Sequence, residues 1–240
     1  MVVATRTFIL GLIILTSARA EDVSDTSPIP DTALSPDKRY GVTVPPSFTD
    51  ADAYSEANNI VDVKSKHVLG YINAPTAYAR MNHSDLLPAW WSTNDGYLLW
   101  QVYGKWGMDT QMLVCLKSGE IQWELDVIKV LQREILTRTE ATDTKKFLAA
   151  KKKNWGSGSA YPETFVIDSQ AKGANKGPLT FPVQFDVFLT SDCKGVGREP
   201  ALDSSMEATL GEDGEIKITG FRMGRNRAAP WYEVQRAGSQ

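Results

Sequence analysis

Residues 181–190 alternate between apolar and polar side chains more regularly than any other part of this chain. The apolar positions are Phe181, Val183, Phe185, Val187 and Leu189. Successive side chains of a β-strand point to opposite faces, so this pattern predicts a strand with one buried face. Two further apolar runs, 206–210 and 216–218, flank the polar segment 212–215 and predict a hairpin, with a bulge at Gly220. We therefore expect a C-terminal antiparallel sheet.

A stripe of apolar side chains predicts an amphipathic helical segment between residues 121 and 153. Its members recur every three or four positions: Ile121, Leu125, Ile128, Leu131 and Ile135. No proline or glycine interrupts this range. Threonines between 137 and 144 predict a break, and Asp143 is a good N-cap for a second helix that ends before Asn154.

Two stretches in the N-terminal half predict antiparallel strand units of similar design. The first unit, 35–72, begins with Ser35-Pro36-Asp37-Lys38 and continues into a short strand and a hairpin. The second unit, 91–121, begins with Trp91-Ser92-Thr93-Asn94-Asp95-Gly96 and continues into two longer strands.

These units resemble the repeats of TolB-like and WD40-like β-propellers, whose blades open with a Ser-Pro-Asp-Gly turn. The resemblance implies blade-like antiparallel strands, although Lys38 stands where that turn has glycine and Thr93-Asn94 replaces its proline. A closed propeller needs at least four blades of about 40 residues, and this chain becomes helical after two units. The opening Ser-Pro-Asp-Lys-Arg-Tyr is also similar to uncharacterised exported bacterial proteins, which implies export and a comparable fold but no activity.

The expected fold class is α+β, in which blade-like antiparallel β units precede an amphipathic helical segment and a C-terminal antiparallel sheet. We expect a signal peptide at 1–20, a flexible leader at 21–34, a blade-like region at 35–120 and a helix-plus-sheet region at 121–240. The last two regions are compatible with a single domain.

The first twenty residues predict a secretory signal peptide. Arg6 precedes an apolar run from Phe8 to Leu15, and Ala18-Arg19-Ala20 is a small-x-small cleavage site. The run is much shorter than the roughly 20 residues of a membrane span, so no span is expected in the mature chain. Cleavage after Ala20 removes two arginines and no acidic residue, so 26 basic and 29 acidic residues become 24 and 29, a net charge of −5. We expect a secreted or periplasmic protein.

The chain contains two cysteines, Cys115 and Cys193. Cysteines of exported proteins usually pair, which predicts a disulfide that joins the two sheet regions. Two buried free thiols, or one reactive thiol, are the alternatives. No metal site is expected, because there is no Cys-x-x-Cys and the chain has only two histidines.

No familiar catalytic or cofactor-binding motif occurs in the sequence. Gly-x-Ser-x-Gly, His-Glu-x-x-His and the glycine-rich loops that bind phosphates or dinucleotides are all absent, so no cofactor is expected. His83 with Asp85 would be the best candidate base of a hydrolase. Neighbouring acids such as Asp50 with Asp52, or Glu212 with Asp213, would suit a glycosidase, but no pair stands out.

Seven tryptophans make the chain rich in a residue that serves both cores and binding surfaces. Four surround the second unit: Trp90, Trp91, Trp100 and Trp106. The core is the favoured place for most of them. Trp90 and Trp106 are the members expected to be exposed, as a ligand-binding aromatic patch.

The leading functional hypothesis is an exported, non-catalytic binding or envelope-associated protein whose partner is an unknown envelope protein or glycan. Nucleic acid is not expected as a partner, because the chain is acidic and its lysines at 145–146 and 151–153 fit a solvated helix face. One alternative is a secreted hydrolase that uses a carboxylate pair. Another is an inhibitor or immunity-like protein with a protruding loop at 74–88.

Overall fold

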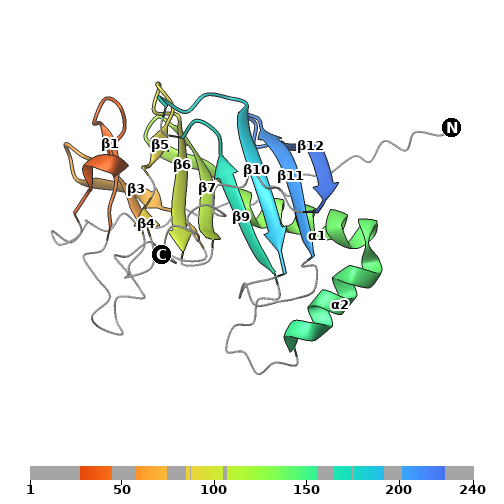
Figure 1. Ribbon diagram of the computed structural model, residues 1–240. Coiled ribbons are helices and arrows are strands. Elements are labelled where there is room, and N and C mark those ends of the chain that lie inside the picture. The colour runs from red at the N-terminus through yellow and green to blue at the C-terminus, as the bar shows by residue number, and fades with distance from the viewer. Residues whose placement is uncertain are drawn as a thin grey trace, which may run out of the picture.

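The computed structural model describes residues 28–44, 58–74, 85–86, 88–104, 107–155, 165–174, 176–191 and 202–224. These residues form three antiparallel sheets, two α-helices and one short 3-10 helix (Figure 1). The α+β class and the C-terminal antiparallel sheet are therefore confirmed. The predicted signal peptide lies outside the described residues.

The N-terminal sheet has the strand order β1-β2-β3. Its strands are β1 (Tyr40–Val42), β2 (Asn59–Asp62) and β3 (His67–Tyr71), preceded by the 3-10 helix η1 (Asp31–Ala33). The hairpin of β2 with β3 confirms the one predicted from the sequence. The end of the expected leader also packs here, because Ala33 is fully buried and the Val44 amide donates to the Pro28 carbonyl. Ordered structure thus begins before residue 34.

The central sheet has the order β4-β6-β7-β8, and β5 also pairs with β6. Its strands are β4 (Asp85–Leu86), β5 (Trp90–Trp91), β6 (Tyr97–Gly104), β7 (Gly107–Lys117) and β8 (Glu120–Asp126). The pairing of β6 with β7 confirms the two strands predicted for the second unit.

Strand β8 corrects the expected start of the helical segment at residue 121. Ser118 and Gly119 both have positive φ, 54° and 80°, which is the conformation of a two-residue hairpin turn. This turn directs the chain back along β7, with Lys117 opposite Glu120. The apolar residues of 121–125 fit alternation as well as helical spacing, and pairing with β7 decides for the strand. The expected domain boundary at 120 therefore falls inside a sheet.

Two helices follow β8. Helix α1 (Val127–Thr142) begins at Asp126, whose side chain accepts a hydrogen bond from the Lys129 amide at 3.0 Å. Helix α2 (Thr144–Trp155) is capped in the same way by Asp143, which accepts from the Lys146 amide at 3.1 Å, as the sequence predicts. Within the described residues, neither helix is long and apolar enough to span a membrane.

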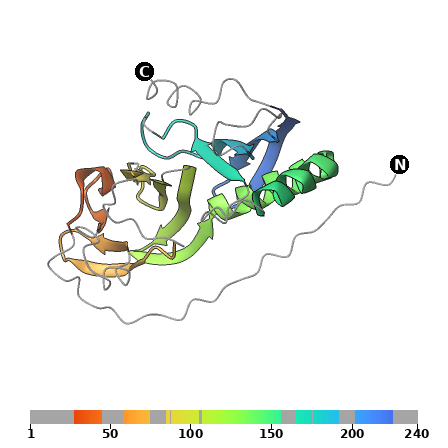
Figure 2. The same ribbon diagram turned by 60° about the horizontal axis from the view of Figure 1, so that its bottom comes forward.

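The C-terminal sheet has the order β12-β11-β10-β9. Its strands are β9 (Val166–Ala171), β10 (Val183–Thr190), β11 (Asp203–Leu210) and β12 (Ile216–Met223). The predicted hairpin of β11 with β12 is confirmed, and its register shifts beside Gly220, where the sequence predicts a bulge. Helix α1 lies along one face of this sheet (Figure 2).

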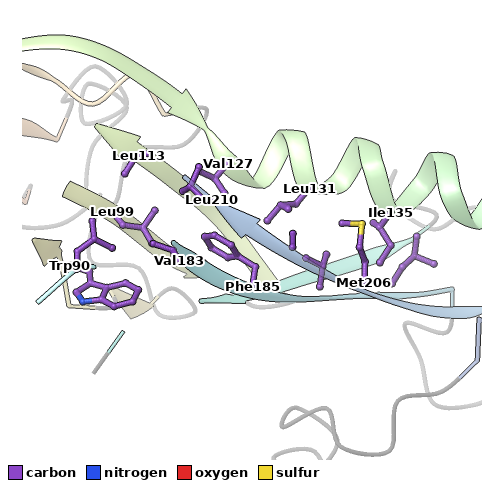
Figure 3. Packing of buried hydrophobic residues seen from close by; sticks show 14 residues of the cluster. Trp90, Leu99, Leu113, Val127, Leu131, Ile135, Val183, Phe185, Met206 and Leu210 are labelled. Atoms are coloured by element: carbon purple, nitrogen blue, oxygen red, sulfur yellow. The ribbon is translucent and has the colours of Figure 1, made fainter. Parts of the chain in front are cut away.

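Two hydrophobic clusters meet at the central sheet. Figure 3 shows one of them, in which Val127, Leu131 and Ile135 of α1 lie over C-terminal strands, with Leu99 and Leu113 joining from the central sheet. The other cluster joins the opposite face of the central sheet to the N-terminal sheet. Its members include Tyr40, Val42, Ile60, Trp91, Leu98 and Trp100. Because both clusters draw on β6, the central sheet is buried on both faces and links the other two sheets.

Candidate functional site

The turn that opens the N-terminal unit is held by the side chains of Ser35 and Asp37. The Ser35 hydroxyl donates to Asp37 Oδ1 at 2.8 Å and accepts from the Tyr40 amide at 3.1 Å. The same Asp37 oxygen accepts from the Arg39 amide at 2.7 Å. A backbone bond from the Ser35 amide to the Tyr40 carbonyl, 2.9 Å, closes the turn.

The turn that opens the second unit repeats this arrangement with other residues. The Ser92 hydroxyl donates to Asn94 Oδ1 at 2.7 Å and accepts from the Tyr97 amide at 2.9 Å. Asn94 Oδ1 also accepts from the Gly96 amide at 3.1 Å. The Ser92 amide donates to the Tyr97 carbonyl at 2.9 Å. Ser35–Tyr40 and Ser92–Tyr97 are therefore equivalent turns, which we call the first turn and the second turn.

Both turns contain one residue in the left-handed region. These residues are Lys38 (φ 60°) and Asp95 (φ 54°), at equivalent positions. Their surroundings differ, because Lys38 is exposed whereas Asp95 is only 7% exposed. The second turn therefore buries a carboxyl group at a position where the first turn presents a lysine to solvent.

The two turns face each other across an open cavity of about 260 Å³. The turn between β7 and β8 completes the wall with Ser118 and Gly119. The remaining lining residues are Asp37, Arg39, Tyr40, Thr93, Asn94, Asp95, Gly96 and Leu116. This volume is slightly below the usual range of small-molecule sites, about 300–1,000 Å³, and suits a compact ligand.

Asp37 and Asp95 form a carboxyl pair at this cavity. Burial, a hydrogen bond with Asp37 and the negative charge of Asp37 raise the pKa of Asp95 to about 6. The backbone hydrogen bond from Arg39, followed by the hydrogen bond with Asp95, lowers the pKa of Asp37. The pair therefore holds one proton below about pH 6, and that proton resides on Asp95.

Oδ1 of Asp95 is buried and has no hydrogen-bond partner within the described part of the chain. Buried polar atoms of native proteins nearly always have partners, because an unpaired one costs about 1–3 kcal/mol. A carboxyl group left in this state beside a cavity is the feature that most clearly distinguishes this site.

Arg39 supplies the positive charge on the cavity wall. Its guanidinium carbon lies 4.9 Å from the centre of the Tyr40 ring, and its Nε lies 4.0 Å from Asp62 Oδ2. Tyr40 in turn stacks on Trp91 at 6.4 Å between ring centres. The exposed Arg39 therefore packs on the ring of Tyr40, and the buried Trp91 supports Tyr40 from the side of the core.

The structure corrects the expected exposure of Trp90. This side chain is 6% exposed, and its Nε1 donates to the Gly177 carbonyl at 2.8 Å. The segment between β9 and β10 lies over it, since a Cβ built on Gly173 would be 3.8 Å from the Trp90 ring. Trp90 therefore belongs to the core and cannot serve as an exposed aromatic platform. Trp106 lies outside the described residues.

The predicted disulfide stays a prediction. Cys115 is half-buried, and burial raises the pKa of its thiol, so the structure gives no sign of an activated thiolate. Cys193 lies outside the described residues.

The other residues singled out in the sequence do not assemble a site among the described residues. His83, Asp50 and Asp52 lie outside them, and the side chain of Asp85 is not described. Glu212 and Asp213 lie in the turn between β11 and β12, where the Asp213 side chain accepts from the Glu215 amide. No group of three or more histidine, cysteine or acidic side chains is placed to hold a metal in the described part of the chain.

A second set of buried polar residues lies between the central and C-terminal sheets. Ser169 donates to Gln111 Oε1 at 2.9 Å, and Gln111 donates to Gln101 Oε1 at 3.0 Å. Tyr103 donates to Asp168 Oδ2 at 3.1 Å, and burial raises the pKa of Asp168. Asp168 Oδ1 and Gln101 Nε2 also have no hydrogen-bond partner among the described residues, but none of these side chains lines the cavity, and we assign them a structural role at the sheet interface.

The residues of the cavity were missed as a site in the sequence, although the turns themselves were recognised. A pattern of serine, one residue, Asp or Asn, two residues and tyrosine occurs at 35–40 and again at 92–97. That repeat is the signal that could have singled out Asp37 and Asn94. Nothing in it shows that Asp95 faces Asp37.

No protein-family model, curated protein or solved structure matches this chain, so the fold and the geometry of the cavity carry the functional argument on their own.

Proposed function

We propose that this chain is an exported, non-catalytic binding protein that holds a compact polar ligand in the cavity between the first and second turns. One observation carries the proposal: Asp95 is buried at the cavity with an unpartnered carboxyl oxygen. A fold that needed only a turn at this position would be more stable with a neutral side chain. Retention of a strained, buried acid is typical of binding or catalytic sites.

The predicted signal peptide supports a secreted or periplasmic location, where the ligand would be part of an envelope glycan or envelope protein. Cavities that bind such groups combine an aromatic base with a few polar groups that point inward. Here Tyr40 and Leu116 contribute the apolar lining, while Asp37, Arg39 and Asp95 contribute the polar groups.

The test uses the mature chain, residues 21–240, immobilised and incubated with the low-molecular-weight fraction of an envelope extract from its source. Mass spectrometry then identifies the compounds that are retained. We expect wild type to retain at least one compound that the Asp37→Asn/Asp95→Asn double variant does not. Asp31→Asn, which removes one exposed acid outside the cavity, serves as the control and is expected to behave as wild type. Identical retention by all three proteins would overturn the proposal.

The carboxyl pair also favours a second candidate, a secreted hydrolase. Two carboxyl groups that share one proton can act as base and acid toward a bound water. Such a pair differs from that of a glycosidase, whose two carboxyl groups lie about 5 Å or more apart, because Asp37 is close enough to Asp95 to raise its pKa through hydrogen bonding and charge. Chemical change of a retained compound on incubation with wild type at pH 5, absent with Asp95→Asn, would favour the hydrolase over the binding protein.

The inhibitor hypothesis gains no support from the described residues. Its proposed loop, 74–88, lies mostly outside them, and the part that is described includes the short strand β4 in the central sheet.

A further inference from the structure

The carboxyl oxygens of Asp37 and Asp95 place hydrogen-bond acceptors on the wall of the cavity between the first and second turns. Asp37 Oδ1 already accepts from the Ser35 hydroxyl and the Arg39 amide, and Asn94 Oδ1 already accepts from the Ser92 hydroxyl and the Gly96 amide. The carboxyl pair adds Oδ1 of Asp95, which has no partner within the described residues. A ligand that suits this cavity therefore brings donors.

The charges of the cavity also favour a ligand that brings hydrogen-bond donors. Asp95 faces two charged side chains, Asp37 and Arg39, both from the first turn. The turn between β7 and β8 contributes Ser118 and Gly119, which carry no charge. With a proton on Asp95, the charges of Asp37 and Arg39 cancel. Once that proton leaves, the cavity carries one net negative charge, which a ligand with one positive charge would neutralise.

Arg39 is exposed to solvent and also interacts with Asp62, which weakens its repulsion of a cation bound beside the carboxyl pair. Its Nε lies 4.0 Å from Asp62 Oδ2, and its guanidinium lies over the Tyr40 ring. The repulsion that Arg39 would exert on a second cation is reduced accordingly.

A metal ion fits this cavity less well than an organic cation. Calcium takes six to eight oxygen ligands and magnesium takes six in a strict octahedron. The two carboxyl groups fall short of the three or more acidic, histidine or cysteine side chains that would mark a metal site, and the described residues form no such group. An ammonium group needs fewer partners, because it carries one charge and three donors on a single atom.

We infer that the ligand of this cavity carries a protonated amine, which donates hydrogen bonds to the carboxyl oxygens of Asp37 and Asp95. This inference rests on the proposed function and names the class of its ligand. The ammonium group keeps its own protons and donates to both carboxylates. Below about pH 6, where Asp95 is still protonated, binding releases the proton of Asp95 to solvent. No covalent bond forms or breaks.

The test compares two probes of the same ring size, cyclohexylammonium and cyclohexanol, by nuclear magnetic resonance titration of the mature chain. The amide signals of Gly96 and Gly119 report on the cavity, since both residues line it. We expect cyclohexylammonium to shift these signals and to bind at least tenfold more tightly than cyclohexanol. Because binding requires ionised Asp95, whose pKa is about 6, affinity is expected to fall about tenfold from pH 7.5 to pH 5.

Two variants locate the effect. Asp95→Asn keeps the shape of the side chain but cannot ionise, so it is expected to weaken cyclohexylammonium binding at least tenfold and to remove its pH dependence. Asp31→Asn is expected to keep both. An indicator dye in weakly buffered solution at pH 5.5 is expected to detect proton release when cyclohexylammonium binds wild type or Asp31→Asn, and none with Asp95→Asn.

The outcomes separate this inference from the proposed function. Equal binding of the two probes, binding of calcium in preference to cyclohexylammonium, or an unchanged affinity in Asp95→Asn would overturn the amine ligand. In those cases, loss of an envelope compound by the Asp37→Asn/Asp95→Asn variant would still support a binding protein. If cyclohexylammonium shows no preferential binding and all variants retain the same envelope compounds, both the amine ligand and the binding function are overturned.

Discussion

The first turn and the second turn have the same hydrogen bonds but different chemistry. In both, a buried serine holds the side chain of the residue two positions on, and the chain then enters a strand at tyrosine. The first turn uses Asp37 in this structural place and leaves Lys38 in solvent, whereas the second uses Asn94 and buries Asp95. A shared backbone scaffold thus permits different side chains at its left-handed position.

The comparison also explains how the carboxyl pair arises. Asp37 and Asp95 do not occupy equivalent positions, because Asp37 matches Asn94 and Asp95 matches Lys38. The pair forms because the N-terminal sheet packs on the central sheet through their shared cluster, which brings one turn against the other. The cavity is therefore a property of the contact between two units.

The largest expected effect tests whether the two turns are equivalent. Ser35→Ala and Ser92→Ala each remove a buried hydroxyl that both donates and accepts, so each is expected to lower the free energy of unfolding by about 1–3 kcal/mol. Urea unfolding of the two variants provides the measurement. Thr93→Ala, an exposed change within the second turn, is the control and should have little effect. A large loss in only one serine variant would show that the turns are not equivalent in energy.

The next effect concerns the buried acid alone. The pKa of Asp95 lies at about 6 in the folded protein, above its ordinary value of 3.8, so the folded state binds a proton more tightly. Ionisation therefore destabilises the fold as the pH rises from about 4 to 6, and the full cost is present above pH 6.

Asp95→Asn removes this cost, so it is expected to raise the free energy of unfolding by about 1–2 kcal/mol at pH 8 and to change it little at pH 4. Thermal unfolding at the two pH values measures the difference. Equal destabilisation at both values would contradict the assignment of the shared proton to Asp95.

A third experiment makes the two turns more alike. Asp37→Asn places in the first turn the residue that the second turn already uses, so Oδ1 is expected to keep its hydrogen bonds. Loss of the neighbouring charge is expected to move the pKa of Asp95 from about 6 toward 3.8. Carbon-13 resonance titration of the Asp95 carboxyl measures this shift. An unchanged pKa would mean that burial alone sets the proton affinity.

The smallest expected effect concerns the left-handed residue of the first turn. Lys38 has φ 60°, a conformation that glycine adopts without steric cost. Lys38→Gly is therefore expected to raise the free energy of unfolding by about 0.5 kcal/mol. Denaturant unfolding with several repeats can resolve this change. Lys38→Asn provides the matched variant, since asparagine also tolerates the left-handed region. Destabilisation by both Lys38→Gly and Lys38→Asn would contradict the conclusion that backbone strain at Lys38 costs stability.

Local elements were predictable where the residues that define them are neighbours in the chain. The strand at Val183–Thr190, the hairpin of β11 with β12 and the N-cap at Asp143 all depend on short-range patterns, and the structure confirms each one. The expected single buried face holds only for the first part of that strand, because Phe188 and Thr190 are buried as well. Strand β8 was mistaken for helix because its apolar residues fit both periods, and a hairpin turn at Ser118 and Gly119 decided between them.

The candidate site was predictable only in part. Recurrence of the serine turn was visible, but the burial of Trp90 was not, because a segment some 85 residues further along the chain covers it. The carboxyl pair was equally hidden, since 58 positions separate Asp37 from Asp95 and neither residue belongs to a recognisable catalytic pattern.

The sequence by itself determined the fold class, most strands and the capped second helix, because hydrophobic period, turn residues and caps act over a few positions. Tertiary structure alone decided that Ile121–Asp126 pairs as a strand, that Trp90 is core, and that Asp37 meets Asp95 at a cavity. Each of these outcomes depends on which surfaces pack together. Packing is a property of the whole interior, so a single segment does not carry it.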